Sequence, residues 1–134
     1  MANNLSVFDI AGRAMSAQMM RLNTTASNLA NAGAVAGSKE EAFRSIKPVF
    51  KSVTDAPGIA TVKVDSVVAT KIDPTKRHDP SNPKADKDGN VWEAAVDQAQ
   101  ELVEMMETSR QYQNNVQVMQ TAKTLTLDTL RLGK

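Results

Sequence analysis

The 134-residue sequence contains no cysteine. That absence excludes disulfide bonds, zinc sites built on thiolates and cysteine nucleophiles, and it leaves the redox compartment open. No run of about 18 consecutive apolar residues occurs either, so the sequence predicts no membrane-spanning helix. Residues 1–9 carry neither a basic segment nor an unbroken apolar segment. We therefore expect export, if it occurs, to proceed without a conventional cleaved signal peptide.

An excess of charge of either sign is also missing. The chain has 16 Lys and Arg residues against 15 Asp and Glu residues, for a net charge of +1. Binding to a phosphate backbone or to an anionic membrane surface needs a basic excess. The composition therefore argues against nucleic acid as a partner and against direct membrane insertion.

The residue patterns of an active site or a cofactor site are absent from the sequence. His78 is the single histidine, no motif places a serine nucleophile beside it, and a solvated loop histidine is the expected reading. Residues 86–90 (DKDGN) resemble part of a calcium loop. One register of that loop places Lys84 and Ala95 at ligand positions, and the other places Val91 where glycine is needed. We predict a protein that is not an enzyme and that binds no cofactor or metal.

The N-terminal end carries a heptad pattern. Apolar or small residues recur in steps of three and four from Leu5 to Leu29, which predicts a helix over about residues 4–31. Gly33 and Gly37 follow it. These glycines do not support a helix, so we expect it to end before them.

The C-terminal end repeats this spacing. Apolar residues recur at heptad positions from Leu102 onward, and no proline follows Pro83. The sequence therefore predicts an unbroken helix from about Trp92 to Leu130. Acidic residues gather in its first half and basic residues in its second half, as the helix dipole favours.

The middle of the chain differs from both ends. All five prolines lie between residues 39 and 90, which excludes a long helix there. Valine alternation over residues 62–72 predicts a short strand, and residues 43–50 predict a second one. Residues 73–90 hold Asp-Pro, Asn-Pro and Asp-Gly steps and are predicted to be a loop.

These patterns predict a mainly α fold. We expect long N- and C-terminal helices that pair as a coiled coil, with an extended or small β insert between them. The predicted divisions are an N-terminal assembly helix (1–32), a linker with a proline-rich extended or β insert (33–90), and a C-terminal assembly helix (91–134).

The N-terminal helix is poor in charge. Residues 1–38 carry only Asp9, Arg13 and Arg21 as charged side chains, and small or amide residues fill the rest of the outer face. Such a face fits burial among several neighbours better than exposure to water. Periodicity alone favours a plain helical hairpin in a monomer, whereas the thin core of so long a seam favours oligomerisation.

The predicted assembly interface consists of the heptad residues of the two helices with two asparagines of the first: Leu5, Phe8, Met15, Met19, Leu22, Asn28, Leu29, Asn31, Leu102, Met105, Tyr112, Val116, Met119 and Leu130.

Both ends also resemble a known family. Residues 8–12 read FDIAG, residues 16–18 read SAQ and residues 21–32 read RLNTTASNLANA. The last run resembles the shared signature of bacterial flagellar axial proteins, the rod and hook subunits. At the other end, residues 109–123 (SRQYQNNVQVMQTAK) and 130–133 (LRLG) are similar to the C-terminal helix of that family. The chain is identified as a member of it, with most similarity to proximal rod proteins.

The resemblance implies a structural subunit of the periplasm-spanning rod of the flagellar basal body, which transmits torque. It implies export without processing by the flagellar type III export apparatus. The implied partners are further copies of the chain, other proximal and distal rod subunits, and the adaptor between rod and membrane ring. It also implies that the terminal helices pair inside the tube while the insert faces outward. The alternative is a cytoplasmic coiled-coil adaptor or chaperone that binds a client through the same helices.

Overall fold

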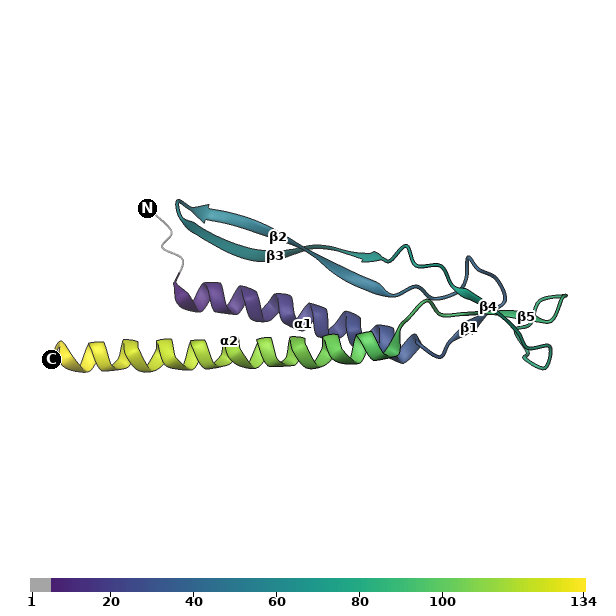
Figure 1. Cartoon of the computed structure of the whole chain (residues 1–134). Coiled ribbons are helices and arrows are strands. Elements are labelled where there is room, and N and C mark those ends of the chain that lie inside the picture. Colours follow the sequence, from purple (N-terminus) through teal and green to yellow (C-terminus); the bar gives the residue numbers. More distant parts are fainter. Residues whose placement is uncertain (1–5) are drawn as a thin grey trace.

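The computed structural model describes residues 6–134, apart from the side chains of residues 55 and 56. The described elements follow one another in the order α1, β1, β2, β3, β4, β5, α2. Figure 1 shows an elongated molecule in which α1 and α2 run antiparallel and a long β2–β3 hairpin lies along α1, on the side away from α2. A small sheet lies beyond the helices, at the end away from the C-terminus (Figure 1).

Helix α1 spans Val7–Asn31. A capping box starts it: the backbone N–H of Asp9 donates to Ser6 Oγ at 3.2 Å, and the backbone N–H of Ser6 donates to Asp9 Oδ2 at 3.0 Å. Both orphan donors of the first turn are thereby satisfied. The predicted end of this helix near residue 31 is confirmed.

Helix α2 spans Gln98–Leu132, and Asp97 caps it by accepting from the backbone N–H of Gln100 at 3.1 Å. The predicted start at Trp92 is wrong, because Asn90–Glu93 forms strand β5. Backbone pairing of β5 with β1 and β4 holds those residues extended. The helix begins where the Asp97 side chain can cap it, six residues after the predicted start.

The insert is built from two antiparallel sheets. Strands β2 (Ile46–Ala56) and β3 (Ile59–Ala69) form a hairpin with two register shifts. Strands β1 (Val35–Ala36), β4 (Thr75–His78) and β5 form the small sheet, in the order β1-β5-β4. The loop predicted over residues 73–90 therefore contains a strand.

The prediction of a mainly α fold is wrong. Of the described residues, 47% are helical and 25% lie in strands, so the protein has a mixed α/β fold. Each hairpin strand is 11 residues long. Exposed strand positions such as Lys63 and Ser66 give no β signal of their own, yet the backbone ladder runs through them, so the prediction of a small β insert understated the hairpin.

The apolar core is thin. The core of the described residues consists of four alanines and one valine, each at most 7% exposed: Ala11, Ala17, Ala42, Ala95 and Val91. Many of the larger apolar side chains on both helices and on the hairpin are more than a third exposed. The single chain therefore covers only part of its apolar surface.

Candidate assembly interface

A buried polar cluster joins α1, β2 and α2 at the base of the hairpin. It consists of Asn28, the backbone of Ile46, Lys47, Glu101 and Glu104, and we call it the base cluster. Asn28 is 0% exposed. Its Oδ1 accepts from the backbone N–H of Ile46 at 2.8 Å, and its Nδ2 donates to the carbonyl of Ile46 at 2.9 Å. The amide thus pairs with Ile46 as a neighbouring strand would.

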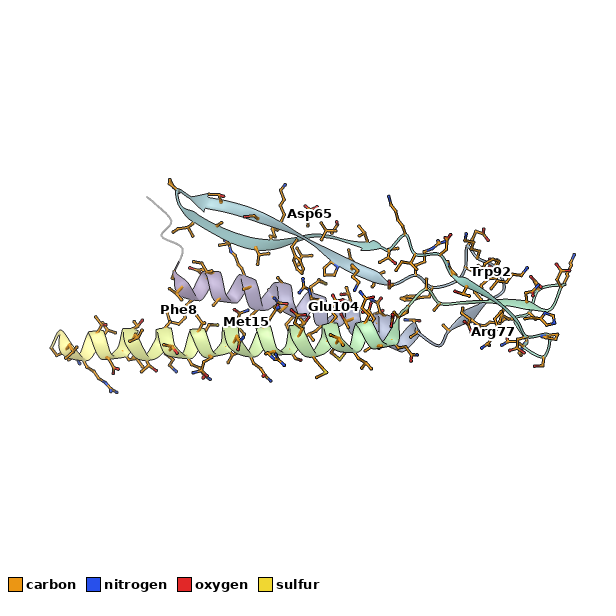
Figure 2. The ribbon with its side chains drawn as sticks, in the orientation of Figure 1. Phe8, Met15, Asp65, Arg77, Trp92 and Glu104 are labelled. Carbon is orange, nitrogen blue, oxygen red and sulfur yellow. The ribbon has the colours of Figure 1, made fainter. Side chains whose placement is uncertain are left out.

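Charge completes the base cluster. Asn28 Nδ2 also donates to Glu101 Oε2 at 3.1 Å, and Lys47 Nζ lies 3.3 Å from Glu101 Oε1. Lys47 also bonds Glu104. Figure 2 shows Glu104 at the place where the two helices lie side by side. Burial by itself would lower the pKa of Lys47, but hydrogen bonds and charge from Glu104 and Glu101 outweigh it and raise that pKa. The buried carboxylate of Glu101 is therefore paired.

Two contacts fix the register of the helices. Gln18 Nε2 donates to Gln111 Oε1 at 2.9 Å, and Asn28 donates to Glu101. The two contacts lie ten residues apart on α1 and ten residues apart on α2. The two helices are therefore antiparallel without a register shift between the contacts. Continuing that register to the start of α1 places Val7 opposite Ala122. Ala122 is also the last half-buried residue of α2, and every residue after it is exposed.

Polar residues line the seam between the helices. Thr25 and Thr108 are buried at 2% and 0% exposure. Among the described side chains, Gln18 Oε1 and Thr108 Oγ1 are buried atoms without a hydrogen-bond partner. Unsatisfied buried oxygens weaken a seam. The helix pair is therefore held chiefly at the base cluster and by half-buried side chains.

The last part of α2 runs past the start of α1 (Figure 1). We call residues 123–132 the overhang; it is about 15 Å long at 1.5 Å per residue. All of its residues are exposed, and its leucines are exposed by 62% at Leu125, 44% at Leu127, 63% at Leu130 and 88% at Leu132. Leu125 and Leu132 share one face of the helix, while Leu127 and Leu130 lie on the opposite side. A helix that is apolar on two sides is suited to burial between neighbours.

A groove lies between α1 and the hairpin. It has a volume of about 550 Å³ and is lined by Arg13, Ser16, Ala17, Met20, Val53, Val62, Lys63 and Val64. Its charged lining residues are both cations, Arg13 and Lys63. Arg13 Nη1 donates to Thr61 Oγ1 at 2.8 Å, and Arg21 stacks over the ring of Phe50 with 5.0 Å to its centroid. These contacts attach the hairpin to α1 along its length.

The predicted interface residues occupy different environments. Asn28 is buried inside the subunit, and Leu5 lies outside the described residues. Figure 2 shows Met15 in the space between α1 and α2. The other half-buried members are Leu22, Leu29, Asn31, Met105, Tyr112, Val116 and Met119, and the exposed members are Phe8, Met19, Leu102 and Leu130. A role of these residues in contacts between subunits stays a prediction.

Sequence reasoning missed three of the residues that hold the subunit together, which are Lys47, Glu101 and Glu104. Acidic residues at the spacing of Glu101 and Glu104 are typical of a solvated helix face, whereas the structure buries Glu101 to 3% exposure. Their spacing of three residues places both on one face, but nothing local to that spacing indicates the lysine of β2 that pairs with them.

The small sheet carries surface ion pairs. Arg77 Nη1 lies 2.9 Å from Glu93 Oε1, and Lys76 lies over the ring of Trp92 at 6.0 Å from its centroid; Figure 2 shows Arg77 and Trp92 at this end. Asp86 Oδ1 accepts from the backbone N–H groups of residues 88 and 90. Those bonds build the predicted turn, which leads into β5 and not directly into the helix.

In the part of the chain that the structure describes, no group of three acidic, histidine or cysteine side chains could hold a metal ion. Neither described helix combines the length and the apolar character needed to cross a bilayer.

Comparison with known proteins agrees with this geometry. A family model described as flagella basal body rod protein matches residues 8–37, and one described as flagellar basal body rod FlgEFG protein C-terminal matches residues 87–132. Proteins named flagellar basal-body rod protein FlgC in Salmonella typhimurium (strain LT2) and Escherichia coli O157:H7 are each 46% identical over 132 residues, which is 97% of this chain and 98% of the relative. The chain belongs to this family of flagellar rod proteins.

More distant relatives also align along the chain. The FlgC protein of Aquifex aeolicus is 32% identical over 124 residues, covering 92% of both chains. The two family models fall on α1 with its following turn and on the segment from the β5 turn through α2. The shared signatures thus lie on the helices.

This rod protein is a structural subunit of the flagellar basal-body rod, and it assembles with other rod components. Its family is not known for an enzymatic activity. The alternative of a coiled-coil adaptor or chaperone is not supported, because the relatives across almost the whole chain are rod proteins.

Proposed function

We propose that the chain polymerises through α1 and α2 to form part of the drive shaft of the flagellum. The observation that carries this proposal is the apolar surface that one chain leaves uncovered on its helices. Leu102, Met106 and Leu130 are exposed by 52%, 67% and 63%. Large uncovered apolar surfaces mark interaction sites.

The structure also supports a mechanical role. The base cluster ties α1, β2 and α2 into one unit through hydrogen bonds and ion pairs. A polymer of such units would transmit torque because close-packed helices with interlocking side chains resist shear. The half-buried residues of the predicted interface would hold α1 and α2 together, and the exposed residues of that interface would contact other subunits.

Four finer assignments belong to this proposal. Residues 1–32 and 91–134 act in assembly, while residues 33–90 provide the insert. The partners are further copies, other proximal and distal rod subunits and the adaptor between rod and membrane ring, and the rod crosses the periplasm. The flagellar type III apparatus exports the chain without a cleaved signal peptide.

Deleting the gene and imaging basal bodies by electron microscopy tests the proposal. We expect membrane rings without a completed rod, and a return of motility when the wild-type gene is restored. A complemented strain carrying Leu130→Met serves as the control for a conservative change in the overhang. Complete flagella in the deletion strain would show that the chain is not required for the rod.

A further inference from the structure

The β2–β3 hairpin is held at its base by contacts that differ from those along its length. At the base, the hydroxyl oxygens of Ser45 and Thr70 lie 2.9 Å apart, and the backbone N–H of Thr70 donates to the carbonyl of Ser45 at 2.8 Å. The base cluster adds bonds to both helices. These directional contacts fix the point from which the two strands leave the helices (Figure 1). Beyond that point, we call residues 49–54 and 59–66 the strap.

Arginines of α1 hold the strap. Arg13 Nη1 donates to Thr61 Oγ1 at 2.8 Å, and the guanidinium of Arg21 lies over the ring of Phe50 at 5.0 Å from its centroid. Residues 1–38 contain no other Lys or Arg. Both basic residues of a charge-poor helix therefore contact the strap.

Two open grooves lie between the strap and α1. The larger has a volume of about 550 Å³, and the second has a volume of about 360 Å³. Ile10 and Met20, which line them from α1, remain 36% and 38% exposed. Packed interiors leave few voids as large as a water molecule. The strap therefore lies over α1 without close packing along these grooves.

We propose that the strap is a hinged arm, which the two arginines latch over α1 in the free chain and which swings away from α1 about the base of the hairpin in the assembled rod. The swing rests on the proposed polymerisation, whereas the latch is a property of the single chain. The backbone ladder between β2 and β3 moves with the strap. Contacts of cations at partly exposed sites are individually weak, so the strap opens while the rest of the chain stays folded.

Close packing in the rod gives the reason for the swing. A shaft that resists shear needs interlocked side chains, and the grooves beside a closed strap are open. The helices are held in register by the contact of Gln18 with Gln111 and by the base cluster. The strap can move without breaking either contact.

Labelling of a cysteine beneath the strap measures the latch in the purified chain, which has no cysteine of its own. Ala17 lines the larger groove and is 4% exposed, so Ala17→Cys reacts with a thiol reagent when the strap opens. The matched control is Ala11→Cys. Ala11 is 5% exposed and lies seven residues before Gln18, on the face of α1 that contacts α2. Opening of the strap exposes position 17 alone, whereas unfolding exposes both positions.

Two changes weaken the latch without altering the lining of the larger groove. Arg21→Ala removes the cation above the aromatic ring, and Thr61→Val removes the acceptor of the Arg13 bond while keeping the size of the side chain. We expect each to raise the labelling rate at position 17 about threefold to tenfold, because that rate follows the open fraction, and to leave position 11 unchanged. An unchanged rate at position 17, or an equal rise at both positions, would overturn the latch.

Cross-linking within one chain tests the swing by comparing the free subunit with the rod. Ser16 and Lys63 line the larger groove from α1 and from β3, so a short thiol-specific cross-linker joins the pair Ser16→Cys/Lys63→Cys when the strap is closed. The control pair is Lys51→Cys/Lys63→Cys, whose positions are partners across the ladder and stay together as the strap moves. Each variant is expressed beside the wild-type gene, so that rods form. The reagent is applied to the purified chain and to isolated basal bodies, and links are counted in the band of single-chain mass.

We expect the link between positions 16 and 63 to fall about fivefold or more from the free chain to basal bodies, because assembly shifts the strap to the open state. The ladder link should be unchanged, which also reports that the variant has entered the rod. A second pair from the same groove, Met20→Cys/Val64→Cys, should fall likewise. Equal yields in the free chain and in basal bodies would overturn the swing. Completed rods in cells that lack the chain would instead refute the proposed function and leave the latch standing.

Discussion

The two ends of α2 are covered in opposite ways. At its first turn the charged residue Glu101 is 3% exposed and bonds Asn28 and Lys47, whereas at its last turn the apolar residue Leu132 is 88% exposed. Globular proteins usually bury leucine and leave glutamate in water. The inversion shows that polar contacts hold the first turn of α2 within the subunit, whereas apolar side chains at its last turn stay uncovered in the single chain.

This division has a physical advantage for a subunit that must exist before the polymer does. Directional hydrogen bonds in the base cluster specify one arrangement of α1, β2 and α2. Apolar burial is not directional and grows with the area removed from water. It would therefore suit the overhang in the proposed assembly, because one chain leaves residues 123–132 exposed.

Replacing Asn28 by alanine gives the largest expected effect on the free energy of unfolding. The change removes the bonds to both backbone groups of Ile46 and to Glu101, and buried polar groups left unpaired cost about 3 kcal/mol in total. Urea unfolding of the purified subunit measures the loss. Asn23→Ala, at an exposed position of the same helix, should change stability by less than about 0.5 kcal/mol. Equal effects would mean that the base cluster does not form before assembly.

Lys47→Met should destabilise the subunit by about 1–2 kcal/mol. It leaves the carboxylate of Glu101, whose side chain is 4% exposed, without its cation, and the figure is moderated because the Lys47 side chain is 31% exposed. A double-mutant cycle with Glu101→Gln measures the coupling, and the exposed neighbour Lys51→Met is the control.

The same lysine gives a pH dependence. Its pKa is raised in the folded chain, so its contribution is complete below the unfolded-state pKa of about 10.4 and is lost as pH rises through the folded-state value. The stability difference between wild type and Lys47→Met should therefore shrink above about pH 10. A constant difference across that range would argue against the charge pairing.

Ser6→Ala should cost about 1 kcal/mol through loss of the N-terminal cap of α1. The side-chain hydrogen bond from Ser6, followed by the bond from its backbone N–H, lowers the pKa of Asp9. The stabilisation from this carboxylate is present above its unfolded-state pKa and disappears as pH falls through the lower folded-state value. An NMR titration should show the pKa of Asp9 moving up in the variant. Ser16→Ala, at an exposed position within the helix, should leave it unchanged.

Leu130→Lys should have the smallest effect on stability, within about 0.5 kcal/mol, because the side chain is already 63% exposed. Motility should nevertheless be lost, since a lysine in a buried contact between subunits lacks a partner. Soft-agar swimming measures this, with Leu130→Met as the conservative control. A marked loss of stability in the isolated subunit would show that the overhang is already packed and would remove the contrast between the two ends of α2.

The helices and their heptad spacing were the parts of the fold most open to sequence reasoning. Heptad periodicity predicted the last residue of α1, Asn31. The five prolines predicted where the insert between the helices lies. The start of α2 was placed too early, because the pairing of β5 depends on strands at positions 35 and 75 that are distant in the sequence. The length of the hairpin was understated for a similar reason, since cross-strand pairing extends through residues without β character.

The candidate site shows the same limit at the level of single residues. Heptad spacing alone selects apolar positions such as Met105 and Val116, and the structure half-buries both. No local pattern predicts the burial of Glu101, because that burial is created by Asn28 and Lys47, which come from two other elements. Asn28 was expected at an interface between subunits, and the structure shows its amide occupied within one subunit.

By itself, the sequence determined two long helices, a proline-rich middle, the lack of an excess of charge and the membership of the flagellar rod family. These are properties of local periodicity, composition and motif, which need no knowledge of distant contacts. Only the tertiary structure decided the mixed α/β architecture, the antiparallel register that leaves residues 123–132 without cover, and the burial of Glu101 against Asn28 and Lys47. Each of these depends on which distant segments lie side by side, and hydrogen bonds between them form only when the whole chain has folded.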